Sequence, residues 1–189
     1  MNLSWIPNAI CIVRILLVGP IVWALWQDAF ELALLLVVVA GFSDAVDGFL
    51  AKRFNWRSRI GSLLDPAADK LLVTSVFLTL TFTGFVPPGL TAIVIGRDVV
   101  IVAGALAYQW LIGPVRGAPT IISKLNTACQ LGFVVFTMTR AAYDWPPLLV
   151  ATLFGAAVVF TSITSGLNYV LHWSKLAWHA KQQGQSVAS

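Results

Sequence analysis

Six long apolar stretches, separated by short polar breaks, occupy most of this 189-residue chain. A helix that crosses a lipid bilayer needs about 20 consecutive, mostly apolar residues, and each stretch is long enough. Hydrophobic residues make up 58% of the chain and charged residues only 11%, which is not the balance of a soluble domain. We therefore predict an all-α integral membrane protein with about six transmembrane helices. The predicted spans are residues 6–26, 30–54, 61–85, 88–112, 121–142 and 146–173.

The breaks between these spans are too short to hold a soluble domain. We predict one transmembrane domain over residues 1–180 and a flexible polar tail over residues 181–189. Lysine and arginine gather in residues 52–59, at Arg116 and Lys124, and at Lys175 and Lys181 near the end of the sequence, whereas the alternate breaks carry mainly acids. Because cytoplasmic loops carry the excess of basic residues, both termini are expected to face the cytoplasm.

The net charge of +4 raises the question of a nucleic-acid partner. The basic residues lie beside the apolar stretches, however, which favours anionic lipid headgroups, and we expect no nucleic acid. Cys11 and Cys129 lie far apart in apolar surroundings, so the sequence indicates neither a disulfide framework nor a thiolate metal site.

Four aspartates stand out in this weakly charged chain. Asp44 and Asp47 are three residues apart near the end of the second span, and Asp65 and Asp69 are four apart at the start of the third. Each spacing places its pair on one helix face. Because a short loop makes the two helices antiparallel neighbours, all four carboxylates are expected to converge at the cytoplasmic ends.

Converging carboxylates near a membrane need a compensating positive charge, because desolvation and mutual repulsion both oppose ionisation. Oxygen ligands of this kind suit a hard divalent cation, and we expect Mg²⁺ or Mn²⁺, with room for two ions. The alternative is that each acid pairs with a nearby Lys or Arg. That alternative explains a single acid better than four acids at helical spacing on adjoining helices.

Small residues flank the acids. Gly48 and Ala51 follow Asp47, and Gly61 precedes Asp65. Glycine in a helix costs about 1 kcal/mol relative to alanine, so a reason for it is expected. Close helix packing is the common reason, and close approach of a flat ligand to the backbone is the other.

These residues together resemble the signature of the CDP-alcohol phosphotransferases. The family pattern Asp-x-x-Asp-Gly-x-x-Ala-Arg, a short gap and Gly-x-x-x-Asp-x-x-x-Asp is similar to the segment that begins "DAVDGFLAK" and ends "GSLLDPAAD". The likeness extends to "IPN" with Arg14 in the first span and to the overall length. It implies a six-helix membrane fold with one catalytic domain, a homodimer, and a cytoplasm-facing site with two metal ions.

The resemblance also implies roles for single residues. Asp44, Asp47 and Asp65 resemble the metal ligands, and Asp69 resembles the residue that both approaches the metal and acts as general base. The CDP-binding positions by the same resemblance are Gly48, Ala51, Lys52 and Gly61. The family has Arg where this chain has Lys52, which can offer a point charge to a pyrophosphate but not the planar two-pronged contact.

The implied reaction is attack by an alcohol on the lipid-linked phosphorus of CDP-diacylglycerol, with release of CMP. Arg97, Lys124 and Arg116 are the residues expected to bind the acceptor. Arg97 and Asp98 are neighbours that project about 100° apart on a helix, so we expect them to have separate partners.

Two acceptors remain open for this reaction. Users of glycerol-3-phosphate in the family tend to carry a second Arg and a second Lys near these positions, as a dianionic phosphate requires. The wording "RDV" and "ISKLNTACQ" resembles instead the cardiolipin synthases of the family, which use phosphatidylglycerol. Phosphatidylglycerol is therefore the expected acceptor and glycerol-3-phosphate the alternative. The expected location of the protein is a bacterial inner membrane.

A protein of another class, a divalent-cation transporter, would also carry intramembrane acids. Transporters often show two related halves with acids near the bilayer centre. This chain shows no evident repeat, and its acids lie at one face beside a basic loop.

Overall fold

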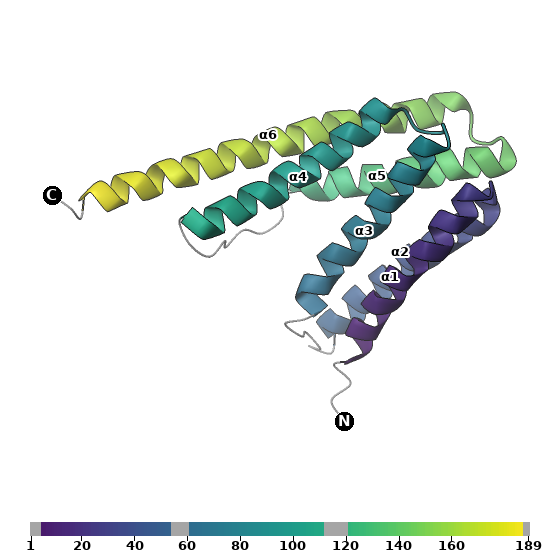
Figure 1. Ribbon diagram of the computed structural model, residues 1–189, viewed down its shortest axis with the longest axis horizontal. Helices are drawn as coiled ribbons and strands as arrows, with labels where there is room; N and C mark the ends of the chain where they lie inside the picture. Colours follow the sequence, from purple (N-terminus) through teal and green to yellow (C-terminus); the bar gives the residue numbers. More distant parts are fainter. Residues whose placement is uncertain (1–4, 54–60, 112–120, 187–189) are drawn as a thin grey trace. The chain divides into compact units, whose positions relative to one another are not determined.

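The computed structural model describes residues 5–53, 61–111 and 121–186, and within them every regular element is an α-helix. Six helices follow one another along the chain (Figure 1). Their bounds are α1 Trp5–Trp26, α2 Phe30–Arg53, α3 Gly61–Phe82, α4 Pro88–Leu111, α5 Ile121–Tyr143 and α6 Leu148–Ser186. The predicted fold class is confirmed, and each helix overlaps one predicted span, although α6 continues past the predicted end at residue 173 to Ser186.

The end of α3 differs from the sequence-based expectation, which placed it at residue 85. The helix ends at Phe82, because Gly84 adopts a φ of 84°, the left-handed conformation that commonly terminates helices. The backbone N–H groups of Phe85 and Val86 then donate to the carbonyl oxygen of Leu80, at 2.8 and 3.0 Å. These bonds satisfy a carbonyl that the helix itself would leave without a donor.

The chain groups into two compact units. Unit 1 comprises Met1–Pro87 and Leu131–Ala151. Within it α1 packs against both α2 and α3 (Figure 1). Aromatic pairs extend this core: Phe77 stacks on Phe133 with ring centroids 5.8 Å apart, and Phe30 meets Phe85 edge to face at 4.6 Å.

Unit 2 comprises Pro88–Gln130 and Thr152–Ser189, and so contains α4, the first part of α5 and most of α6. Its interior includes several buried polar side chains. These are Arg97, Asn126, Gln130, Ser162 and Ser165. Buried polar groups at mid-helix are costly unless they bond to one another, so they are expected to form a network.

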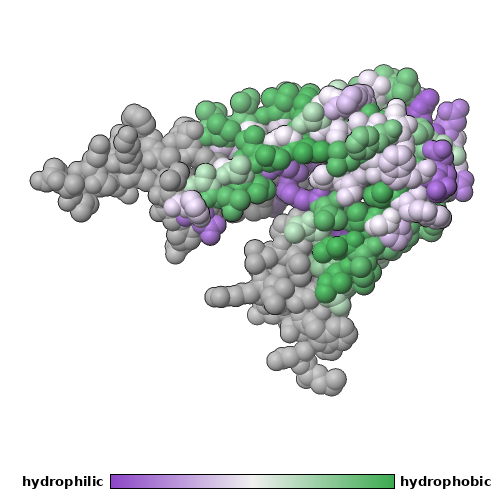
Figure 2. Space-filling view, viewed as in Figure 1, coloured by the Kyte–Doolittle hydropathy of each residue, from purple (hydrophilic) through white to green (hydrophobic). Residues whose placement is uncertain are grey.

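Large apolar side chains are exposed on the helices, among them Leu16, Phe42, Trp110 and Phe160. Figure 2 shows apolar residues over much of the coloured surface. Four helices contain a stretch long and apolar enough to cross a membrane, as judged over the described residues. These stretches are Ala9–Trp26, Pro88–Ala107, Ile121–Tyr143 and Leu148–Leu171. Such surfaces suit lipid and not water, which indicates an integral membrane protein.

The predicted boundary at residue 180 falls inside α6, which continues to Ser186. Helical backbone therefore covers most of the segment that the sequence analysis assigned to a tail. The division into one domain over residues 1–180 and a tail stays a prediction, as does the cytoplasmic orientation of both termini.

Candidate active site

Two of the four aspartates meet at a single cationic nitrogen in unit 1. Asp44 lies in the second half of α2, and Asp69 lies near the start of α3. The Nη1 atom of Arg14, on α1, is 2.9 Å from Oδ1 of Asp44 and 2.7 Å from Oδ1 of Asp69. The structure therefore brings together one acid from each of the two predicted pairs.

Burial differs sharply between the members of this cluster. The side chain of Arg14 is 1% exposed, whereas those of Asp44 and Asp69 are each 44% exposed. A guanidinium held inside an apolar helix bundle needs anionic partners, and the two carboxylates supply them. The acids keep an open side that a cation or a substrate can approach.

The other members of the predicted cluster are described less fully. Asp47 lies on α2 and Asp65 on α3, so both are on the helices that carry the first two acids. Their side chains lie outside the part of the chain that the structure describes. Within the described side chains, no group of three or more potential metal ligands is found. A site with all four acids stays a prediction.

The side chains of the predicted nucleotide-binding residues also lie outside the part of the chain that the structure describes. Gly48, Ala51 and Lys52 lie on α2 and Gly61 begins α3, but their surroundings are not among the described features. Arg116 lies between α4 and α5, outside the described residues.

Arg97 lies at the centre of unit 2 and joins its three helices. The residue is 8% exposed, and its Nη2 atom donates to Ser123 Oγ on α5 at 2.6 Å and to Ser165 Oγ on α6 at 2.8 Å. Its Nη1 atom forms an ion pair with Asp98 at 2.6 Å. The expectation that Arg97 and Asp98 only have separate partners is therefore wrong, because the long arginine side chain folds back far enough to reach its neighbour.

A second buried polar cluster lies along α5 and α6. Asn126 is fully buried, and its Oδ1 atom accepts hydrogen bonds from Thr161 at 2.9 Å and Ser162 at 2.8 Å. Sequence reasoning missed these hydroxyl partners and noticed Asn126 only as part of a motif. The signal available was the spacing of Ser123, Asn126 and Gln130, which places them on one face of an otherwise apolar helix.

Comparison with known proteins decides the family. The sequence profile described as "CDP-alcohol phosphatidyltransferase" matches residues 4–173. The chain belongs to the CDP-alcohol phosphatidyltransferase family. Members of this family generally use divalent metal ions.

Named relatives of this family match most of the chain. It is 32% identical over 180 residues to the cardiolipin synthase (CMP-forming) of Homo sapiens, which covers 87% of this chain and 60% of the relative. The corresponding protein of Rattus norvegicus is 31% identical with the same coverage. The chloroplastic CDP-diacylglycerol–glycerol-3-phosphate 3-phosphatidyltransferase 1 of Oryza sativa is 28% identical over 190 residues, 90% of this chain and 57% of the relative. The chain thus spans about 60% of the length of these relatives.

The family's metal requirement fits the donor set in unit 1. Asp44 and Asp69 offer oxygen atoms close enough to share one cationic nitrogen, and both are partly exposed. Carboxylate oxygens are the ligands that Mg²⁺ and Mn²⁺ prefer. The residues present therefore suit a hard divalent cation.

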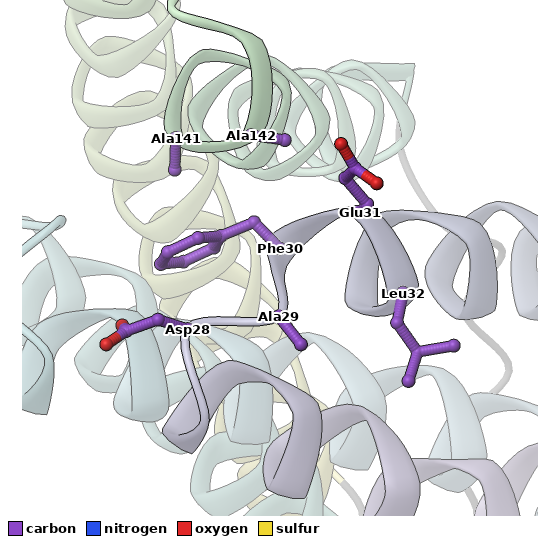
Figure 3. Close-up of a pocket in the computed structure, with 7 residues that line it drawn as sticks. All are labelled: Asp28, Ala29, Phe30, Glu31, Leu32, Ala141 and Ala142. Atoms are coloured by element: carbon purple, nitrogen blue, oxygen red, sulfur yellow. The ribbon is translucent and has the colours of Figure 1, made fainter.

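A pocket in unit 1 lies away from these acids. It has a volume of about 350 Å³ and is lined by residues of the α1–α2 turn, the start of α2 and the end of α5. In Figure 3 the ring of Phe30 lies near Ala141, and the carboxylate of Glu31 points away from that ring. The pocket borders the first turn of α2, roughly 20 Å along the helix from Asp44 at the usual rise per residue. We assign it no role in the family's chemistry.

Ser162→Ala is expected to lower the free energy of unfolding by about 1–2 kcal/mol, because it removes a donor from the buried Oδ1 atom of Asn126. Thr164→Ala is a matched control on the same helix, since its exposed hydroxyl donates to the carbonyl oxygen of Phe160. Unfolding of both variants in one detergent gives the comparison. Equal effects of the two substitutions would contradict a stabilising role of the buried cluster.

Proposed function

We propose that this chain transfers the phosphatidyl group of CDP-diacylglycerol to phosphatidylglycerol, forming cardiolipin and CMP. The observation that carries the proposal is the meeting of Asp44 and Asp69, from two helices, at one nitrogen of Arg14 in a chain of this family. That arrangement supplies two partly exposed carboxylates, which can hold the divalent cation that the anionic pyrophosphate of the substrate requires.

In the proposed reaction, the acceptor hydroxyl oxygen forms a bond to the lipid-linked phosphorus. The bond from that phosphorus to the bridging oxygen of CMP breaks, and CMP leaves with the electron pair. Asp69 is proposed to accept the proton of the hydroxyl as a general base. A carboxylate that is 44% exposed is accessible for this proton transfer.

Asp44, Asp47, Asp65 and Asp69 would hold the divalent cation, which we propose to be Mg²⁺ or Mn²⁺ with two ions per site. When bound, the metal neutralises the pyrophosphate and stabilises the negative charge of the leaving group. Asp44 and Asp69 also join α2 and α3 to α1 through Arg14.

Gly48, Ala51 and Gly61 are proposed to let the cytidine diphosphate approach the backbone closely, because they present little or no side chain. Lys52 is proposed to face the pyrophosphate as a point charge. Because this lysine replaces a family arginine, binding of the nucleotide is proposed to depend more on the metal and less on paired hydrogen bonds.

Arg97, Lys124 and Arg116 are proposed to bind the acceptor. Lys124 is exposed near the start of α5, and the Nε atom of Arg97 has no hydrogen-bond partner among the described residues. One buried guanidinium, already shared with Asp98, suits a monoanionic phosphodiester better than a dianionic phosphate. This balance of charge, together with the relatives named cardiolipin synthase, favours phosphatidylglycerol.

The proposed setting is the inner membrane of a bacterium, with the acids and both termini on the cytoplasmic side. This orientation rests on the basic residues between α2 and α3 and in the tail. The active form is proposed to be a homodimer, and each copy would carry its own set of acids.

Purified protein in lipid vesicles with CDP-diacylglycerol and Mn²⁺ tests the acceptor choice. We expect isotope-labelled phosphatidylglycerol to appear in cardiolipin, with one CMP released per product, as read by mass spectrometry. Labelled glycerol-3-phosphate in a parallel reaction should give little product. Use of glycerol-3-phosphate alone would overturn the preferred acceptor and support the second candidate, a reaction like that named for the rice relative.

A further inference from the structure

Arg14 occupies an unusual position for a charged residue. It lies within the apolar, membrane-length stretch of α1 from Ala9 to Trp26, and only 1% of its side chain is exposed. Burying a guanidinium in such surroundings is costly unless carboxylates compensate for the lost hydration. Asp44 and Asp69 provide that compensation, and they are also acids of the proposed metal site.

One atom of Arg14 makes both contacts. Nη1 is 2.9 Å from Oδ1 of Asp44 and 2.7 Å from Oδ1 of Asp69, so it lies between the oxygens that would bind a metal ion. A divalent ion of this type binds its oxygen ligands at about 2 Å. A divalent ion bound to either of these oxygens would therefore lie within about 5 Å of Nη1, where the two positive charges repel each other.

We propose that Arg14 is an internal counter-ion of the metal site. It holds Asp44 and Asp69 together when no metal is bound and yields at least one of them when a divalent cation enters. The inference rests on the metal site of the proposed function. Arg14 is a positioning residue, because it acts on the reaction through the acids and not through the substrate.

Two consequences follow from electrostatics. Without metal, Arg14 offsets the repulsion between the two carboxylates and so stabilises the contact of α2 and α3 with α1. With metal, its positive charge lies beside another cation and weakens binding. Removing the charge should therefore lower the stability of the metal-free protein and raise its affinity for the metal.

Two variants and one control test this inference on the full chain in detergent. Arg14→Gln removes the charge, and Arg14→Lys keeps a charge but loses the planar guanidinium. Arg140→Gln is the control, since Arg140 also lies in unit 1 and bonds Asp144 at 3.8 Å and the carbonyl oxygen of Pro146 at 3.0 Å. Mn²⁺ binding is measured by electron paramagnetic resonance, and thermal unfolding is measured with EDTA and with Mn²⁺.

Arg14→Gln is expected to bind Mn²⁺ at least about tenfold more tightly than the wild type, because one neighbouring positive charge is lost. It should unfold at a lower temperature in EDTA, and Mn²⁺ should recover most of that loss. Arg14→Lys should give an intermediate Mn²⁺ affinity, which keeps the test decisive if the glutamine variant does not fold. Arg140→Gln should change neither the Mn²⁺ affinity nor the gain in stability on adding Mn²⁺.

The outcomes separate this inference from the proposed function. Mn²⁺ binding that is lost in Asp44→Asn but unchanged in both Arg14 variants would overturn the role of Arg14 and leave the metal site intact. Mn²⁺ binding that survives Asp44→Asn and Asp69→Asn would overturn the metal site and the Arg14 inference together.

Discussion

Asp69→Asn is expected to lower the rate of CMP release from CDP-diacylglycerol by about 10²–10⁴-fold, the usual contribution of a general base. Asparagine keeps the size and shape of the side chain but cannot accept the proton of the acceptor hydroxyl. It is also a poorer ligand for a divalent cation, so the loss should lie toward the upper end of this range. The rate is measured with purified protein, saturating substrate and Mn²⁺.

Asp144→Asn is the matched control for this substitution. Asp144 also lies in unit 1, its side chain is 95% exposed, and its ion pair with Arg140 is long at 3.8 Å. It should release CMP at the wild-type rate. Thermal unfolding of Asp69→Asn checks that the fold persists, which is expected because Asp44 still pairs with Arg14. Full activity of Asp69→Asn would remove the assigned base.

Arg97→Met is expected to lower the free energy of unfolding by about 3–5 kcal/mol, the usual result of removing one member of a buried ion pair. The substitution leaves Asp98, only 15% exposed, without the guanidinium 2.6 Å away. It also removes the donor that joins Ser123 on α5 to Ser165 on α6. Chemical unfolding in detergent measures the difference from the wild type.

A second substitution tests whether the loss of stability comes from the unbalanced charge of Asp98. Adding Asp98→Asn to Arg97→Met removes the negative charge that Arg97 offsets in the wild type and should recover part of the lost stability. Arg140→Met is the control for loss of an arginine, because Arg140 is 33% exposed and its ion pair should contribute at most about 1 kcal/mol. Equal losses for Arg97→Met and Arg140→Met would contradict the central position of Arg97 in unit 2.

The helices could be predicted from the sequence because the bilayer imposes a length. A span of about 20 apolar residues is a strong and local signal, and the predicted spans match α1 to α5 closely and the first part of α6. Local backbone conformation explains why α3 ends before the predicted residue 85. Its end at Phe82 follows from the left-handed backbone of Gly84, a feature that hydropathy alone does not register.

The site could be predicted only in part, because its decisive contacts join distant residues. The spacing within each pair, Asp44 with Asp47 and Asp65 with Asp69, indicated that its members share a helix face, and the structure brings Asp44 and Asp69 together. The contact of Arg14 with both Asp44 and Asp69 could not be predicted, since it depends on how α1 packs against α2 and α3. The contact of Arg97 with Asp98 was missed for another reason. Helix geometry fixes the direction in which a side chain leaves the backbone, but not where the end of a long side chain lies.

Polar residues within the apolar spans were the least predictable. Thr161 and Ser162 are adjacent on α6, and nothing in their spacing identifies Asn126 as their shared acceptor. Hydroxyl groups in apolar helices commonly bond to a carbonyl of their own helix, as Thr164 does with Phe160. Only packing decides which hydroxyl reaches a neighbouring helix.

Location of bound Mn²⁺ by anomalous diffraction from crystals of the full chain tests most directly whether the aspartates of α2 and α3 form one metal-binding cluster. We expect a peak about 2 Å from carboxylate oxygens of both helices, including Asp44 or Asp69, with Nη1 of Arg14 moved away from at least one of them. A peak elsewhere in the protein, with Arg14 still bridging both acids, would contradict it.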